Sequence, residues 1–390
     1  MEAFAFDTTE QYLLAAVGIL FAVQVLYYLV LYNRIHLRSR KAGRNDLHFT
    51  QELSPLSVII CAHEEVENLR RNLPAILEQD YPQFEVIVIN DGEKSENEDY
   101  LTQLENHYQN LYHSFVPDSS RYISRKKLAV MLGIRAARYD WLVMTEANCC
   151  PQSNQWLRLL ARNFTSHTEV VLGYSGYERG YNWLHRRAAF DSLFTAIRYL
   201  GFALAGSPYM GIGRNLAYRK SLFFDRKGFS AHLNLRRGDD DLFVNQVACR
   251  DNTRVETDPA AVVRMQPLFH TKDWREEKIG YTSTASLYHG MQRRLLGFET
   301  FSRLLFHAAW IVTVVRAILH AHWLVAGIGI LLFALRFTMQ TLVINFTAKD
   351  LGEKYRYRFL LPIFDILQPL QSLRWKLYCL FRDKREFLRK

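Results

Sequence analysis

The sequence predicts an α/β protein in which a mostly parallel sheet is joined to membrane-spanning helices. Two observations lead to this prediction. Between residues 56 and 265, short apolar runs alternate with helical patterns, and strands that alternate with helices form parallel sheets with helices on both faces. Outside that region lie three longer apolar stretches, two of which carry a single arginine each. Apolar stretches of about 20 residues can cross a bilayer as helices.

Three apolar, β-branched runs form the expected centre of the sheet: LSVIICA (56–62), FEVIVIN (84–90) and WLVMT (141–145). Uninterrupted runs of this kind suit strands that are buried on both faces. A helical pattern begins at Val66, and we expect Pro74 to end or kink that helix. The other expected elements are helices over 95–108, 125–139 and 181–206, a helical stretch around Trp274, and short strands over 111–116, 253–257 and 260–265.

The first long apolar stretch, residues 12–32, contains no charged residue. A signal peptide would begin with basic residues and have a shorter apolar core, whereas this chain begins with Glu2, Asp7 and Glu10 and leaves the stretch with basic residues. We therefore expect an uncleaved anchor with its N-terminus outside and the chain from residue 33 onward in the cytoplasm.

Two further apolar stretches, 304–321 and 323–346, are separated only by His322 and contain Arg316 and Arg336. They could form a hairpin buried in a protein core. Two membrane helices, or one spanning and one shallow helix, fit better, with the arginines near helix ends or snorkelling to the interface. Two crossings would return the C-terminus to the cytoplasm, and residues 359–381 are expected to lie in the membrane interface.

The net charge of +10 and the five cysteines narrow the class of protein. Basic residues crowd beside the apolar stretches, which is typical of membrane topology and of attraction to anionic lipid headgroups. No basic-aromatic nucleic-acid module is present, so we expect no nucleic-acid partner. The cysteines form no CxxC pair, which disfavours a zinc site and favours free thiols in a reducing compartment.

The sequence RRGDDDLFVNQVA (236–248) places Asp239, Asp240 and Asp241 in succession at the start of a helical pattern. One acidic residue would be enough to cap the helix. Three adjacent carboxylates repel one another, and a protein usually tolerates this to hold a cation, move a proton or bind a sugar. The pattern therefore indicates a functional site.

Polar residues also follow three expected strands: His63-Glu64, Asp91-Gly92 and Glu146-Ala147-Asn148. Ligands of open parallel sheets bind beyond the carboxyl ends of the strands, where these residues are expected to meet. The loop GSPYMGIGRN (206–215) contains G-x-G but lacks the third glycine and the preceding strand of a dinucleotide-binding motif. We therefore expect no dinucleotide cofactor there.

Taken in order, these segments resemble the family 2 glycosyltransferases of GT-A fold. The resemblance covers about residues 55–290, and GDDDL resembles the acidic catalytic-base motif of that family. It implies a Rossmann-like, mostly parallel sheet that binds a nucleotide-diphosphate sugar. The motifs are SVIICAHEE (57–65), FEVIVINDG (84–92), RKKLAVMLG (125–133), WLVMTEANCCP (141–151) and GIGRNLAYR (211–219). The expected organisation is an anchor (1–33), a basic linker (34–54), a cytoplasmic GT-A domain (55–295), a transmembrane hairpin (303–347) and a basic, partly interfacial tail (348–390).

The resemblance also assigns roles to individual residues. Asp240 matches the general base, and Asp239 and Asp241 would orient the acceptor or a metal ion. The residues expected to bind the nucleotide sugar are Ala62, Glu64, Asp91, Lys126 and Glu146.

Two motifs depart from the family pattern. Where the family carries a metal-binding DxD, this chain has Glu146 and Asn148, which keep oxygen ligands for Mn²⁺ or Mg²⁺ but lose one negative charge. Where relatives carry QxxRW after the base, this chain has EKIGY (277–281), which lacks the arginine. A guanidinium that could hold phosphate or the acceptor is missing there, and Arg275 or Lys278 are the expected substitutes.

The sequence thus predicts a multi-pass enzyme of the bacterial cytoplasmic membrane. It would transfer single sugars, with inversion, from a nucleotide-diphosphate sugar to a lipid-linked or glycan acceptor of a cell-envelope polysaccharide. Because two motifs are altered, the alternative is a catalytically weakened homologue that acts as a membrane scaffold or as partner of an active transferase. A transporter would need more than three spans.

Overall fold

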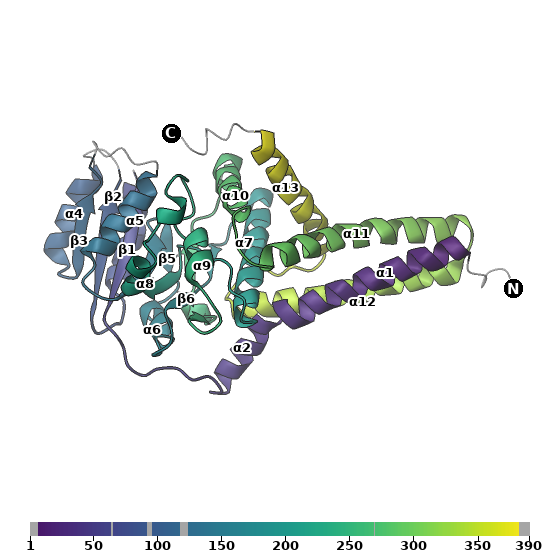
Figure 1. The fold of residues 1–390 in the computed structure, drawn as a ribbon, viewed down its shortest axis with the longest axis horizontal. Helices are drawn as coiled ribbons and strands as arrows, with labels where there is room; N and C mark the ends of the chain where they lie inside the picture. The colour runs from purple at the N-terminus through teal and green to yellow at the C-terminus, as the bar shows by residue number, and fades with distance from the viewer. Residues whose placement is uncertain (1–6, 64, 92–95, 118–123, 269, 382–390) are drawn as a thin grey trace.

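The computed structural model describes residues 7–63, 65–91, 96–117, 124–268 and 270–381. Figure 1 shows a lobe built from the sheet and its helices, and an arm of long helices that extends from it. We use "the lobe" for the described residues from Leu56 to Ala285 and "the arm" for the helices α1 (Thr8–Leu26), α11 (Gln292–Leu319) and α12 (Trp323–Asp350). Helix α1 begins at the far end of the arm.

Among the described residues, the main sheet has seven strands in the order β3-β2-β1-β4-β8-β6-β9. The first four in this order are parallel, and β8 runs antiparallel to β4 and β6. The central strands are buried on both faces, which confirms the interpretation of the apolar runs. The strands are β1 (Leu56–Ala62), β2 (Phe84–Asn90), β3 (Leu111–Phe115), β4 (Trp141–Glu146), β6 (Val170–Leu172), β8 (Leu216–Arg219) and β9 (Thr253–Val255).

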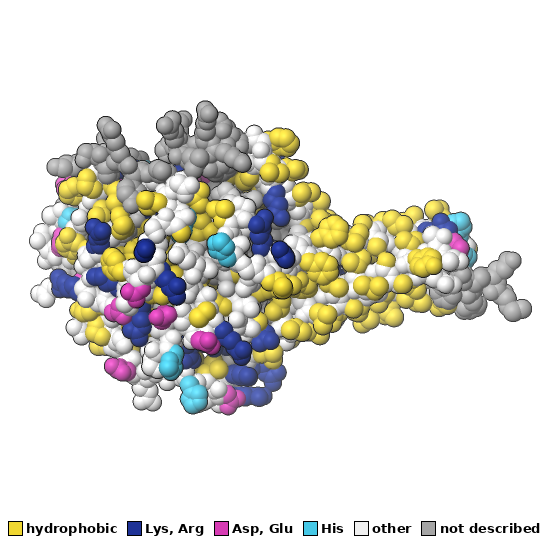
Figure 2. All heavy atoms as spheres, in the orientation of Figure 1, with side chains coloured by type: hydrophobic (Ala, Val, Ile, Leu, Met, Phe, Trp, Pro, Cys, Tyr) yellow, Lys and Arg dark blue, Asp and Glu magenta, His cyan; other side chains and the backbone are white. Residues whose placement is uncertain are grey.

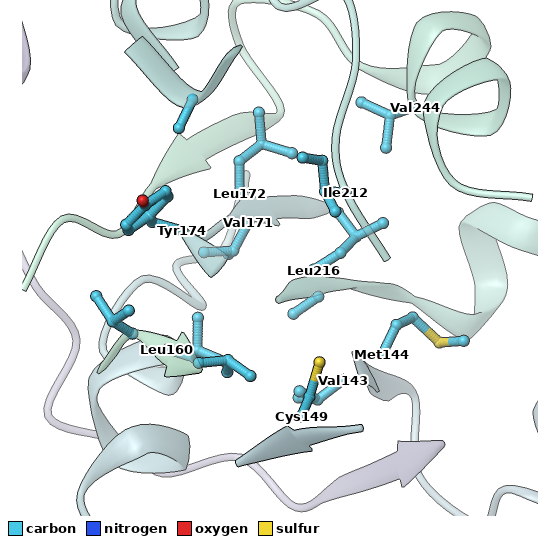
Figure 3. Close-up of a cluster of buried hydrophobic side chains, with 14 of the residues drawn as sticks. Val143, Met144, Cys149, Leu160, Val171, Leu172, Tyr174, Ile212, Leu216 and Val244 are labelled. Carbon is cyan, nitrogen blue, oxygen red and sulfur yellow. The ribbon is translucent and has the colours of Figure 1, made fainter. Parts of the chain in front are cut away.

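A small second sheet joins segments that are distant in sequence. It pairs β10 (Val263–Met265) with β5 (Cys149–Pro151) and with β7 (Ser175–Tyr177). Between the two sheets, apolar side chains from β4, β6, β8 and neighbouring segments pack together, as Figure 3 shows for Val143, Val171 and Leu216. This core fixes the end of β4, where the expected site begins.

The helices of the lobe lie close to the ranges expected. Ser124 caps α5 by accepting a hydrogen bond from Lys127 N (3.2 Å), and Gly133 lets this helix approach β1, since a Cβ there would lie 2.7 Å from Ile59. The helices are α3 (Val66–Leu77), α4 (Glu96–His107), α5 (Arg125–Ala136), α6 (Trp156–Ala161), α7 (Trp183–Leu204), α8 (Lys220–Asp225), α9 (Asp241–Val247) and α10 (Thr271–Ala285).

Pro74 was expected to end or kink its helix, and the first of these alternatives is wrong: α3 continues past Pro74 to Leu77. The missing N–H leaves the carbonyl of Arg70 without its helical partner, but Arg70 is exposed and water can bind that oxygen. Burial of Leu73 and Ile76 against the sheet outweighs the lost hydrogen bond.

In the part of the chain that is described, each helix of the arm belongs to a helical segment that is long and apolar enough to cross a membrane. The first combines α1 (Thr8–Leu26), the π-helix η2 (Tyr27–Tyr32) and α2 (Arg34–Gly43), and the others are α11 (Gln292–Leu319) and α12 (Trp323–Asp350). Hydrophobic side chains cover most of the arm in the view of Figure 2, and Lys and Arg side chains gather where the arm meets the lobe.

The first part of residues 34–54, which were expected to form a basic linker, folds as the helix α2. This helix contacts α7 of the lobe and α12 of the arm. The lobe is also joined to η2, since a Cβ on Gly201 of α7 would lie 2.8 Å from the backbone oxygen of Leu31. Arg34 adds a hydrogen bond from Nη1 to the Leu204 carbonyl (3.3 Å).

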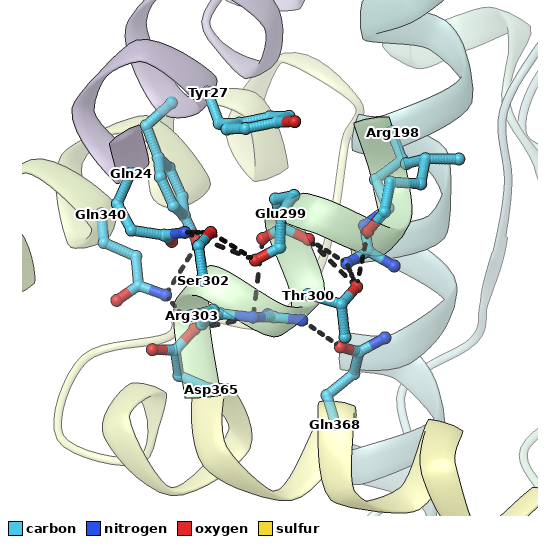
Figure 4. Close-up of polar contacts among 12 residues, drawn as sticks. Gln24, Tyr27, Arg198, Glu299, Thr300, Ser302, Arg303, Gln340, Asp365 and Gln368 are labelled. Carbon is cyan, nitrogen blue, oxygen red and sulfur yellow. Dashed lines mark hydrogen bonds and ion pairs between the residues drawn. The ribbon is translucent and has the colours of Figure 1, made fainter. Parts of the chain in front are cut away.

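Arg336 also differs from expectation, because it neither lies near a helix end nor snorkels. It is 1% exposed in the middle of α12 and pairs with Asp365 of α13 (Leu361–Phe381) through an Nη2–Oδ2 contact of 2.8 Å. The surrounding polar residues, drawn in part in Figure 4, are called the anchor network here. They are Gln24, Tyr28, Arg198, Glu299, Ser302, Arg303, His307, Arg336, Gln340, Asp365 and Gln368.

Candidate functional site

The acidic motif and the carboxyl end of β4 meet at a cavity of about 20 Å³, which is room for about one water molecule. Its walls come from β1, α5, β4, the glycine-rich loop before β8, and the start of α9. The polar residues that line it include Lys126, Thr145, Glu146, Asp239 and Asp240. The fold thus brings segments that are far apart in the sequence to the carboxyl end of β4, as expected for a site of a parallel sheet.

Asp240 is the N-cap of α9, and its carboxylate is held in place by three hydrogen bonds. Oδ2 accepts from Gly213 N (2.9 Å) and from the Tyr281 hydroxyl (2.9 Å), and Oδ1 accepts from Asp241 N (2.7 Å). Burial, followed by the nearby charge of Asp239, raises the pKa of Asp240 above its ordinary value. A raised pKa makes a carboxylate a better proton acceptor near neutral pH.

Lys126 connects the two acidic elements of the site. Its Nζ lies 2.8 Å from Glu146 Oε1 and 3.1 Å from Asp239 Oδ2. Burial alone would lower the pKa of this lysine, but the carboxylates around it, Asp239 first, raise it well above its ordinary value. The lysine is therefore a permanent cation at the wall of the cavity.

Arg214 holds the other oxygen of Glu146 and was not expected from the sequence. Its Nε donates to Glu146 Oε2 (2.9 Å), and its two Nη atoms donate to the two carboxylate oxygens of Glu277 (3.3 and 2.9 Å). Burial would raise the pKa of Glu146, but Lys126 and Arg214 lower it well below the ordinary range. Glu146 is thus ionised and fixed in position.

The structure also corrects the expected substitutes for the missing arginine of the QxxRW-like segment. Lys278 is ion-paired with Asp191, and Arg275 is exposed. The guanidinium that pairs with Glu277 of this segment is that of Arg214, from the loop before β8. The sequence signal for it was indirect: two carboxylates, Glu146 and Glu277, stand where the family carries aspartate and glutamine, and each needs a cation if it is buried.

Asp241 has a different place from the one expected. Its side chain faces α10 rather than the cavity, and Oδ2 accepts hydrogen bonds from Thr284 and from the Tyr288 hydroxyl (2.7 Å). Burial, followed by the charge of Asp240, raises the pKa of Asp241 to about 7. This residue fastens α9 to α10, whereas Asp239 and Asp240 line the cavity.

The residues expected at the first two strand ends lie near one another. The carbonyl of Ala62 accepts a hydrogen bond from Asp91 N (2.7 Å), and Asp91 Oδ1 pairs with Arg125 Nε (2.5 Å). Glu64 lies outside the described residues. Its neighbour Glu65, which the sequence did not single out, is partly buried, and its pKa is raised to about 7, first by burial and then by Glu146.

The expected metal ligands offer oxygen atoms of the type that Mg²⁺ and Mn²⁺ prefer. Both oxygens of Glu146 contact cationic side chains, however, and Asn148 Oδ1 accepts a hydrogen bond from Cys149 Sγ (3.2 Å). No group of three acidic, histidine or cysteine side chains within the described ranges could hold a metal ion. The site therefore fits an ion only if a substrate's phosphate oxygens complete its coordination, as is common for Mg²⁺.

Comparison with known proteins identifies the family that part of the chain matches. Residues 57–225 match the sequence model described as glycosyl transferase family 2. No curated protein matches the chain. Among solved structures, the chain is similar to the mannosyltransferase PcManGT from Pyrobaculum calidifontis in complex with GDP-Man and Mn²⁺, with 17% identity and a TM-score of 0.56 over 89% of this chain and 99% of that one.

It is also similar to S. aureus TarS, with 15% identity and a TM-score of 0.42 over 65% of this chain and 42% of that one. The likeness to the mannosyltransferase concerns the fold, and the family match covers β1, β2, β4 and the glycine-rich loop, which build the cavity. The protein is a glycosyltransferase in which residues 57–225 belong to a family 2 domain of GT-A fold.

Proposed function

We propose that this glycosyltransferase is bound to the cytoplasmic membrane and transfers one sugar at a time to a lipid-linked or glycan acceptor. The sugar comes from a nucleotide-diphosphate donor. The observation that carries the proposal is the position of Asp240, a hydrogen-bonded carboxylate at a cavity that also exposes the cation of Lys126. A base and a fixed positive charge are the two groups that sugar transfer from a diphosphate needs.

In the proposed reaction, Asp240 takes the proton of the acceptor hydroxyl while the acceptor oxygen forms a bond to the anomeric carbon. The bond between that carbon and the diphosphate oxygen breaks, and its electron pair leaves with the nucleoside diphosphate. A single displacement of this kind inverts the anomeric centre. Lys126 stabilises the negative charge that grows on the diphosphate, and Arg214 keeps Glu146 aligned with the lysine.

A divalent cation, Mn²⁺ or Mg²⁺, belongs to the proposal together with the donor. Glu146 and Asn148 would hold it with the phosphate oxygens, and it would neutralise further charge on the diphosphate. The permanent cations of the site act whether or not the ion is bound.

The membrane location rests on the arm. Three apolar helical segments extend from the lobe in the described part of the chain, and their outer surfaces are hydrophobic. Basic side chains at the base of the arm suit the cytoplasmic side of a bilayer, with the N-terminus on the opposite side. An acceptor anchored in that membrane would meet the lobe at its surface. Three segments are few for a sugar-conducting pore, which favours transfer of single residues.

Binding of UDP and of GDP to the detergent-purified protein, measured by calorimetry with Mn²⁺ and with EDTA, tests the donor site. We expect one of the two nucleotides to bind. If neither binds to the folded protein, the proposal fails and the scaffold function becomes the better explanation.

The base is tested by Asp240→Asn, with Asp225→Asn as the matched control, since Asp225 is an exposed aspartate away from the cavity. We expect the first variant to lower sugar transfer into the lipid fraction of membranes by about 10²- to 10⁴-fold, because general base catalysis contributes about that much. Nucleotide binding should be kept. Unchanged transfer would refute Asp240 as the base.

A further inference from the structure

Helix α10 faces the site with four residues spaced as one helical face: Glu277, Gly280, Tyr281 and Thr284. Three of them hold a named partner. Glu277 binds Arg214, Tyr281 donates to Asp240, and Thr284 donates to Asp241. Gly280 has no side chain to contribute, and it lies between two of these contacts.

The space above Gly280 is occupied by Arg237, which precedes the acidic motif. A Cβ on Gly280 would lie 2.5 Å from Arg237 Cδ and 2.6 Å from its Nε, closer than real side chains approach. The arginine therefore lies flat on the helix, and the glycine makes this possible. Arg237 and Gly280 together therefore place a guanidinium group beside α10, close to the position that the side chain of an arginine at position 280 would occupy.

The guanidinium of Arg237 differs from the other cations near the site in its partners. Lys126 and Arg214 are both held by carboxylates, whereas Arg237 is exposed and, across the described residues, makes no ion pair with any carboxylate. Among the described residues, its guanidinium therefore has no carboxylate to release when an incoming anion binds.

The charge of the site calls for such a group. Glu146, Asp239 and Glu277 outnumber Lys126 and Arg214, so a diphosphate that enters the site meets an excess of negative charge. We propose that Arg237, lying on Gly280, is a binding residue for the diphosphate of the donor. The planar guanidinium can donate two parallel hydrogen bonds to phosphate oxygens. This inference rests on the proposed donor class.

The test compares nucleotides with their nucleosides, so that the phosphate contribution is isolated. Calorimetry would measure UDP, GDP, uridine and guanosine against the unmodified protein and Arg237→Ala, with Arg236→Ala as the matched control because Arg236 is also an exposed arginine. We expect Arg237→Ala to weaken binding of the diphosphate about tenfold or more, as for a lost hydrogen bond to a charged group. Binding of the nucleoside should be unchanged, and Arg236→Ala should resemble the unmodified protein.

A second variant moves the guanidinium from position 237 to position 280, on the other side of the contact between Arg237 and Gly280. Arg237→Ala combined with Gly280→Arg places an arginine on α10 itself, and we expect it to restore at least half of the lost affinity on a logarithmic scale. Gly280→Ala alone should displace Arg237 and weaken diphosphate binding by a smaller factor.

Three results would overturn the inference: equal diphosphate affinity in Arg237→Ala, an equal loss for nucleoside and diphosphate, or no recovery in the double variant. Failure of the unmodified protein to bind either nucleotide would instead refute the donor class, and the inference with it.

Discussion

The candidate site and the anchor network both contain buried charged groups, but these groups differ in their exposure to solvent. In the anchor network, Arg303, Arg336 and Asp365 are at most 1% exposed, and their charged groups pair with one another and with neighbouring polar groups. In the site, the side chains of Lys126 and Glu146 are 40% and 25% exposed beside a cavity. Charges sealed from solvent join helices, whereas charges with access to solvent are available to a substrate.

The strongest test of this difference is Asp365→Ala in the anchor network. Removing the carboxylate leaves Arg336 buried without its anion and Arg303 with Glu299 alone, and losing one partner of a buried pair costs about 3–5 kcal/mol of stability. We expect a large fall in the thermal midpoint of the detergent-solubilised protein. The double variant Arg336→Met, Asp365→Leu should fall less, because it removes opposite charges together. A midpoint unchanged in Asp365→Ala would show that the network does not hold the arm.

A pH titration of stability sharpens the comparison at the site. Because the pKa of Asp241 is raised to about 7 in the fold, the folded protein binds this proton more tightly than the unfolded chain does. Stability from this group is therefore complete at low pH and is lost as the pH rises from about 4 to 7. Asp241→Asn should become more stable relative to the unmodified protein across that range, by about 2–4 kcal/mol at pH 8.

The measurement is the thermal midpoint of both proteins at matched pH values between 4 and 8. Glu65, whose pKa is also about 7, is present in both and cancels from the difference. A constant difference between the two proteins would show that Asp241 is ionised throughout.

The smallest effect is expected at the far end of the arm, where Asp7 pairs with Arg316 (2.7 Å). Both side chains are substantially exposed, and exposed ion pairs contribute little to stability. Asp7→Asn should leave the thermal midpoint unchanged within error, both without added salt and with about 0.5 M NaCl, which screens exposed charges. A clear destabilisation would mean that this pair is shielded from water.

Much of the lobe could be predicted because its signals are local. Continuous β-branched runs mark strands buried on both faces, and the strand ends then bring Asp91 and Glu146 to one edge of the sheet, where Lys126 of α5 pairs with Glu146. The glycine before the acidic motif likewise marks a turn, since Gly238 has a φ of +98°.

The contacts that complete the site could not be predicted, because they depend on packing between distant segments. Arg214 and Glu277 are 63 residues apart, and the local sequence around either residue gives no sign of the contact between them. The burial of Arg336 was missed for the same reason, since its partner Asp365 lies on a helix that the sequence indicated only as interfacial. Pro74 was misjudged because tertiary burial outweighed a local helix-breaking signal.

The close crossing of α7 and η2 at Gly201 has a consequence for how the enzyme reaches its acceptor. Together with α2, it fastens the lobe to the arm, so residues 44–55 are not a flexible tether between the two. In the proposed membrane-bound enzyme, the active site would then stand at one height above the bilayer. An acceptor must present its hydroxyl at that height, and much of the orientational freedom that a loosely tethered enzyme would lose on meeting its substrate is already absent.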